Sequence, residues 1–268
     1  MKYLLNLIAI LVFSLASCQT GKLNVIVDIN SDLEEVSAIE VTSNNPLFWV
    51  IEDAGNKNSI YGLDNTGRIV KSIDIENAKN EDWEDLTSDS QGNMYIGDFG
   101  NNSKKREEFS ILKISNINTV KDKSTASKIN FTLPKNVKSK DFEAFFLLND
   151  KFYIFSKENK DALLISVPNV IGNHVATLIT EFKLKGKHSE ITSADISDDG
   201  KTVVLLNHDK LWKLTRFTND NFFNGNIESI DFEHDSQKEG ICFKNESSIY
   251  ITDESSKSEG GNIYSFNF

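Results

Sequence analysis

Seven carboxylic acids occur at equivalent places in paired apolar segments, and this spacing indicates a cation site. In five segments a polar residue opens one short apolar run, and a second apolar run ends in another polar residue. The opening residues are Glu35, Glu84, Glu143, Thr192 and Glu239, and the closing residues are Asp53, Asp98, Ser156, Asn207 and Asp253. If each pair of runs forms antiparallel strands, an opening residue and its closing residue lie at the same end of the pair.

Carboxylates gathered at one place require a compensating charge. Two of them about 4 Å apart repel by about 4 kcal/mol at an effective dielectric near 20. Ca²⁺ relieves such repulsion because it takes about six to eight oxygen ligands, carboxylates included. We therefore expect Ca²⁺ to be the cofactor, and its predicted ligands are Glu35, Asp53, Glu84, Asp98, Glu143, Glu239 and Asp253. Protonation of some carboxyls or a hydrated acidic funnel would also relieve the repulsion.

Five further residues are predicted to contact a ligand at the same place. Three are the uncharged residues of the pattern, and two come from the segments 82–85 and 98–102; together they are Ser156, Thr192, Asn207, Trp83 and Asn101. The Trp83 indole could stack on a ligand or pack between neighbouring sheets. Asn101 could offer an amide oxygen to a cation or stabilise a tight turn.

The spacing of the segments predicts the architecture that brings these residues together. The openings recur at intervals of roughly 50 residues, as expected for propeller blades of four strands each. A third and a fourth strand follow in each segment except the last, which lacks the fourth. A spare strand at residues 23–29 would complete that blade and close the ring. We predict an all-β, five-bladed propeller closed by an N-terminal strand; six blades, a β-sandwich or an open barrel are the alternatives.

The N-terminus has the pattern of a lipoprotein signal peptide. Lys2 precedes a short apolar run that is below the about 20 residues of a membrane-spanning helix, and the run ends in Leu15-Ala16-Ser17-Cys18. This resembles the lipobox at which a cysteine becomes the lipidated first residue. We expect a signal peptide at 1–17, then the lipidated Cys18 with a short tether and closing strand at 18–30, and the propeller at 31–268. An ordinary secretory peptide is the alternative.

Composition and charge limit the partners. A net charge of −11 argues against nucleic acid as a partner. Contact with the membrane is expected through the lipid anchor only, which would place the protein in the bacterial cell envelope, at the outer membrane. If Cys18 carries lipid, Cys242 has no disulfide partner in the chain. No nucleophile elbow, phosphate-binding loop or histidine-rich metal motif occurs, so no enzyme class is assigned.

Longer motifs carry a family resemblance. The most distinctive are Asp82-Trp83-Glu84-Asp85 and Gly97-Asp98-Phe99-Gly100-Asn101-Asn102, and Glu239-Gly240 repeats the pattern near the C-terminus. Over nearly all of residues 30–268 the chain resembles secreted bacterial β-propellers related to the SdiA-regulated and esterase-like phytase groups. The resemblance implies a propeller with acidic residues near its axis. A more distant similarity to calcium-dependent apyrases lacks their histidine-glutamate-serine segment.

Two classes of function remain open from the sequence. The first is a binding module whose acidic site holds Ca²⁺ and a small molecule or protein partner. The alternative is a metal-dependent hydrolase of phosphate esters or lactones, with Glu84 or Glu143 as base or ligand. A glycosidase that uses two of the carboxylates is a third reading, but the sequence singles out no pair.

Overall fold

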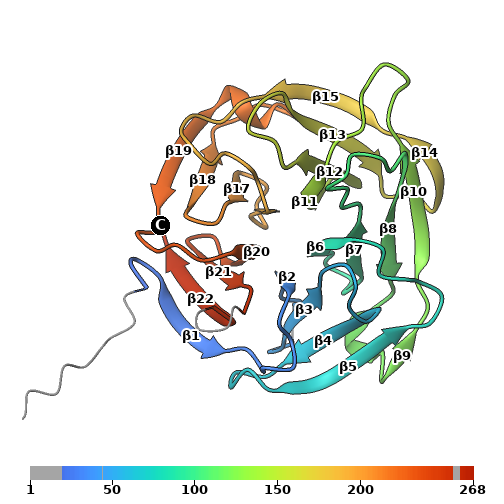
Figure 1. Ribbon diagram of the computed structural model, residues 1–268, viewed down its shortest axis with the longest axis vertical. Coiled ribbons are helices and arrows are strands. Elements are labelled where there is room, and N and C mark those ends of the chain that lie inside the picture. Colours follow the sequence, from blue (N-terminus) through green and yellow to red (C-terminus); the bar gives the residue numbers. More distant parts are fainter. Residues whose placement is uncertain (1–19, 44, 256–259) are drawn as a thin grey trace, which may run out of the picture.

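Five sheets, three of four strands and two of five, are arranged around a central axis, as Figure 1 shows for the computed structural model. The structure describes residues 20–43, 45–255 and 260–268. The predicted signal peptide and Cys18 lie outside these residues. No helix within the described ranges is long and apolar enough to cross a membrane. The predicted five-bladed propeller is confirmed.

Each blade is a meander of antiparallel strands that runs from the axis outward. Blade 1 contains β2 (Val36–Glu40), β3 (Phe48–Glu52), β4 (Ser59–Leu63) and β5 (Ile69–Ile75). Blade 2 contains β6 (Trp83–Ser88), β7 (Met94–Asp98), β8 (Glu108–Ile114) and β10 (Ser127–Thr132). Blade 3 contains β11 (Phe142–Leu148), β12 (Lys151–Ser156), β13 (Ala162–Pro168) and β15 (Thr177–Phe182). Blade 4 contains β16 (Ser193–Ile196), β17 (Thr202–Leu206), β18 (Lys210–Thr215) and β19 (Asn226–Asp231). Blade 5 contains β20 (Lys238–Asn245), β21 (Ser248–Asp253) and β22 (Asn262–Asn267).

The N-terminal strand β1 (Asn24–Asp28) closes the ring as the sequence predicts. It pairs antiparallel with β22 and becomes the outer strand of blade 5. Leu23, which is 3% exposed, packs just before β1 into the apolar cluster between blades 4 and 5. The N-terminal strand therefore joins the last blade by backbone hydrogen bonds and by burial of apolar surface.

Two short strands cross between blades, and the sequence pattern did not predict them. β9 (Lys123–Ser124) pairs in parallel with β5 of blade 1, and β14 (Gly172–Val175) pairs in parallel with β10 of blade 2. β9 lies between Glu84 and Glu143, which are farther apart in the sequence than any other two successive opening residues. Two 3₁₀ turns, Ile117–Thr119 and Phe222–Asn224, complete the regular structure of the described residues.

Five apolar clusters hold neighbouring blades together. Each cluster combines side chains from two adjacent blades, and the five clusters cover the five junctions of the ring. The alternation of apolar residues along the strands produces this arrangement, since successive side chains of one strand point to opposite neighbours. Cys242 is a free, buried thiol in the junction between blades 5 and 1.

A buried aspartate lies where the inner strands approach one another. Asp85 of β6 accepts hydrogen bonds from the backbone amides of Leu86, Phe145 and Ala194 and from the Ser193 hydroxyl. The residues at the same register on the other inner strands are small: Ala38, Ala144, Ser193 and Gly240. Through its hydrogen bonds, Asp85 ties blades 2, 3 and 4 together.

Candidate metal centre

At one end of the central axis, the innermost strand of each blade begins and the second strand of each blade ends. We call this end the acidic mouth. The register pairs Trp83 with Asp98, Phe142 with Ser156 and Lys238 with Asp253 at this end. The ends of paired strands therefore meet as the sequence predicts.

A β-bulge sets the direction of the glutamates at the acidic mouth. The pairing shifts between Trp83 and Asp85, so that Glu84 is the extra residue, and Glu143 and Glu239 take the same position in blades 3 and 5. A bulge commonly re-aims a side chain. All three glutamates are buried, with exposed fractions of 7% or less. The sequence motifs therefore mark bulges as well as acidic groups.

Blade 1 corrects the alignment predicted from the sequence. Its bulge falls at Ser37, between Val36 and Ala38, so Ser37 and not Glu35 is the counterpart of Glu84. Glu35 is exposed, and its Oε2 accepts a hydrogen bond of 2.7 Å from Asn56. The sequence pattern aligned Glu35 with Glu84 because Glu35 is acidic and lies only two positions before the bulge residue Ser37.

Three carboxylates at the acidic mouth converge. Asp53, Asp82 and Glu84 each offer an oxygen, and these oxygens lie within 4.8 Å of one another. Asp53 follows β3, Asp82 precedes β6 and Glu84 is the bulge residue of β6. We refer to these three as the acidic triad. Asp53 and Glu84 were predicted as metal ligands, whereas Asp82 was not.

The acidic triad is crowded, and the positive charge of Arg106 and Lys157 reaches it only from a distance. Burial raises the pKa of Asp82 to about 6, and the negative charge of Asp53 adds to this shift. Burial also raises the pKa of Glu84 well above its usual value, with further contributions from Glu143 and Asp53. Among the described residues, no lysine or arginine forms an ion pair with the acidic triad. Burial and mutual repulsion therefore make all three carboxyls hold their protons more tightly than usual, which raises their pKa values.

Gly100 makes this convergence possible. A Cβ at this position would lie 1.9 Å from Oε1 of Glu84 and 2.5 Å from Cγ of Asp82. The Gly100 amide also donates a 3.2 Å hydrogen bond to the Asp82 carbonyl. The backbone after β7 thus forms a cradle for two of the three carboxylates.

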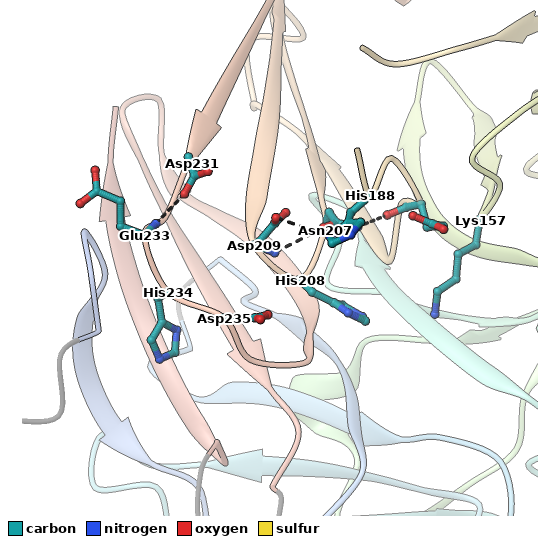
Figure 2. Close-up of a pocket in the computed structure, with 10 residues that line it drawn as sticks. Lys157, His188, Asn207, His208, Asp209, Asp231, Glu233, His234 and Asp235 are labelled. Carbon is teal, nitrogen blue, oxygen red and sulfur yellow. Dashed lines mark hydrogen bonds and ion pairs between the residues drawn. The ribbon is translucent and has the colours of Figure 1, made fainter. Parts of the chain in front are cut away.

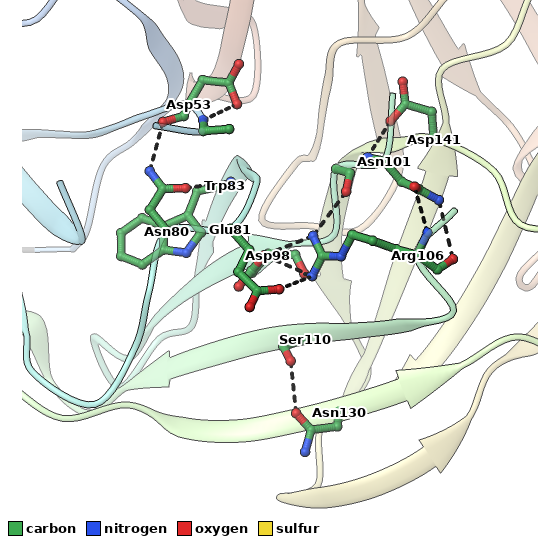
Figure 3. A network of polar contacts seen from close by, with 12 residues as sticks. Asp53, Asn80, Glu81, Trp83, Asp98, Asn101, Arg106, Ser110, Asn130 and Asp141 are labelled. Atoms are coloured by element: carbon green, nitrogen blue, oxygen red, sulfur yellow. Dashed lines mark hydrogen bonds and ion pairs between the residues drawn. The ribbon is translucent and has the colours of Figure 1, made fainter. Parts of the chain in front are cut away.

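The remaining predicted metal ligands each have a partner within the protein. Asp98 accepts from the guanidinium of Arg106 at 3.1 Å, and Figure 3 shows this pair within a polar network. Glu143 contacts Lys157 at 2.6 Å. Charge compensation at these carboxylates is therefore internal.

Two more of the predicted metal ligands have neutral or titratable partners. Glu239 lies 3.1 Å from Nε2 of His208. Asp253 is fully buried and accepts from the Tyr264 hydroxyl at 2.8 Å and from the Asn262 amide at 2.9 Å. Asp253 therefore stabilises the turn that leads into β22, and only two of the seven predicted ligands belong to the acidic triad.

Trp83 and Asn101, both predicted to contact a ligand, take part in core packing and in loop hydrogen bonds, respectively. Trp83 is fully buried in the cluster between blades 1 and 2, in agreement with the packing alternative. Asn101 accepts hydrogen bonds from the amides of Lys105 and Arg106 and donates to Ser139. Its amide therefore stabilises the loop after β7 (Figure 3).

The other three predicted ligand contacts also form hydrogen bonds to the backbone. Ser156 accepts from the Leu163 amide, Thr192 donates to the Lys238 carbonyl and Asn207 donates to the Glu190 carbonyl. All three are buried.

A cavity adjoins the acidic mouth on the side of blades 3 to 5. It has a volume of about 660 Å³, and Figure 2 shows ten side chains that line it. Lys157 and His208, the partners of Glu143 and Glu239, are among them. A ligand in this cavity would therefore contact side chains that already pair with carboxylates of the mouth.

The opposite mouth holds a second cavity of about 700 Å³, lined by residues from all five blades. Glu40 and Asp195 lie in it, and burial raises the pKa of Asp195 to about 7. Glu40 accepts from the Ser88 hydroxyl, and Asp195 accepts from the Phe243 amide. These bonds link neighbouring blades.

Fold and acidic mouth together define a five-bladed β-propeller with a carboxylate cluster at one end of its axis. A family model described as SdiA-regulated matches residues 21–257. The chain belongs to the SdiA-regulated family, as the sequence motifs suggest. No curated protein matches the chain.

Proposed function

We propose that this protein is a binding module whose acidic triad holds one Ca²⁺ and whose adjoining cavity receives a ligand or protein partner. The observation that carries the proposal is the convergence of Asp53, Asp82 and Glu84 with no positive partner among the described residues. The Gly100 cradle adds support, because a larger residue would displace two of these carboxylates.

The donor set and its size favour calcium. All three ligands are carboxylate oxygens, which suit hard cations. Ca²⁺ lies about 2.3–2.6 Å from its oxygen ligands and accepts irregular coordination geometry. The triad oxygens lie within 4.8 Å of one another, so a single Ca²⁺ could contact all three.

The location is a second part of the proposal. We infer that Cys18 carries lipid and anchors the protein in the bacterial cell envelope, at the outer membrane. Support comes from the apolar run at 3–17 and from the sequence Leu15-Ala16-Ser17-Cys18. Mass spectrometry of the membrane fraction would detect the acyl chains on Cys18, and a Cys18→Ser variant should release the protein from that fraction.

Hydrolysis of phosphate esters or lactones is the second candidate function. It is favoured by the pair of His208 and Glu239, which are 3.1 Å apart beside the cavity and could activate a water molecule. Turnover that is lost both with EDTA and in His208→Gln would support it.

Thermal melts test the calcium site. A ligand at 100 times its dissociation constant stabilises the folded state by about 2.7 kcal/mol, which shifts the melting temperature clearly. We expect calcium to raise the melting temperature of the purified protein and EDTA to reverse the rise. Glu84→Gln should abolish the shift, whereas Glu181→Gln, a change at an exposed residue of β15, should preserve it. An equal shift in Glu84→Gln would count against the proposed site.

A further inference from the structure

The acidic mouth divides into two halves that differ in positive charge. One half is the acidic triad, which has no lysine or arginine partner among the described residues. The other half contains Glu143 and Glu239, which belong to blades 3 and 5. A lysine and a histidine from the protein itself reach this second half.

The ammonium group of Lys157 occupies the second half. Its Nζ lies 2.6 Å from Oε2 of Glu143, and the two side chains are 25% and 4% exposed. The Lys157 amide donates a 2.9 Å hydrogen bond to the Asp141 carbonyl, so the backbone holds this residue at the mouth. Figure 2 shows the Lys157 side chain extending into the space beside His208.

Other carboxylates of the mouth also act on Lys157. Burial alone would lower the pKa of its ammonium, but the charges of Glu143, Glu239 and Glu84 outweigh burial and raise the pKa. Lys157 is therefore a cation at neutral pH. Burial and neighbouring carboxylates raise the pKa values of Asp53 and Glu254, and the Lys157 charge opposes part of both shifts, so its field extends across the mouth.

We propose that Lys157 is the resident cation of the second half of the mouth and limits the protein to a single divalent ion. The lysine pairs directly with Glu143, and its charge also acts on Glu239, so these two carboxylates are compensated without a metal. This inference builds on the proposed calcium site, but it concerns different carboxylates. Its consequence is a specific one: loss of the lysine charge should open a second cation site.

Calcium stoichiometry measured by equilibrium dialysis tests the inference. The wild-type protein and Lys160→Met, a change at an exposed lysine three positions away, should each bind one ion. Lys157→Met should bind two. Lys157→Arg keeps the charge and should bind one. A single ion in Lys157→Met, at whatever affinity, would overturn the inference.

A second pair of variants separates this inference from the proposed function. Glu84→Gln should bind no calcium, and Glu84→Gln combined with Lys157→Met should bind one ion, at Glu143 and Glu239. If the wild type binds none while the double variant binds one, the acidic triad is not a calcium site and the role of Lys157 stands. If the double variant binds none, the role of Lys157 is refuted.

A third variant guards against loss of folding. Lys157→Met leaves Glu143 buried without its partner, which is destabilising. Lys157→Met combined with Glu143→Gln removes both charges, and should fold and bind one ion. Two ions in this variant would show that Glu143 is not a ligand of the second site and would overturn the inference.

Discussion

Removal of the Asp85 carboxylate should weaken the whole ring. Four donors from three blades converge on this side chain, at distances of 2.9–3.3 Å. Asp85→Ala would leave the amides of Leu86, Phe145 and Ala194 without an acceptor in the core. Each buried donor left unpaired costs about 1–3 kcal/mol, and a water molecule entering the space would recover part of this. We expect a loss of about 3–5 kcal/mol in the free energy of unfolding.

Asp85→Asn should lower the free energy of unfolding less than Asp85→Ala does, because asparagine keeps one acceptor oxygen at this position. The amide oxygen can replace Oδ2 and accept from Phe145 and Ala194, while the amide nitrogen faces Leu86 and the Ser193 hydroxyl. The hydroxyl can rotate to accept a hydrogen bond, so only the Leu86 amide loses its partner. The expected cost is about 1–2 kcal/mol.

Urea denaturation at pH 7 measures both losses. Asp122→Ala, at an exposed aspartate, is the matched control and should change the free energy by less than about 0.5 kcal/mol. A cost below about 1 kcal/mol for Asp85→Ala, or a larger cost for Asp85→Asn than for Asp85→Ala, would refute the role assigned to this residue.

Three further predictions concern the cradle, the protons of the mouth and ring closure. Gly100→Ala should reduce calcium affinity at least tenfold in calorimetry, because the new Cβ collides with Glu84 and Asp82; unchanged affinity would exclude the cradle. The pKa of Asp82 is raised from an ordinary value of 3.8 to about 6, so the folded state binds this proton more tightly than the unfolded state does. The stability that the bound proton contributes is therefore lost as pH rises from about 4 to about 7. Melts without calcium should therefore show a smaller decline in Asp82→Asn than in the wild type, and equal declines would contradict the shift. Leu23→Ala should cost about 2–4 kcal/mol in denaturant unfolding, since Leu23 is buried between blades 4 and 5; a loss below about 1 kcal/mol would argue against its part in closure.

The sequence predicted the blades because each strand carries its own signal. Apolar side chains alternate along the strands, and the incomplete fifth unit together with residues 23–29 identified the closing strand. The crossing strands β9 and β14 carry no such signal. Lys123 and Ser124, for example, form a strand only because the backbone of β5 lies beside them.

The candidate site was predicted less completely because it depends on contacts across blades. Asp82 is one residue before Trp83 in the most distinctive motif, but only the fold shows that it meets Asp53 of blade 1. The pairing of Glu143 with Lys157 depends equally on the spatial arrangement of strand ends. A pattern of carboxylates therefore located the mouth, whereas their partners decided which of them are available to an ion.

Crystals soaked in Mn²⁺, a stand-in for Ca²⁺ with anomalous scattering, would test the central claim most directly. The acidic triad should show one anomalous peak, bonded to oxygens of Asp53, Asp82 and Glu84, and excess Ca²⁺ should displace it. No peak should occur between Glu143 and Glu239 while Lys157 is present. An empty triad at saturating Mn²⁺, with the ion absent or bound elsewhere, would contradict the account.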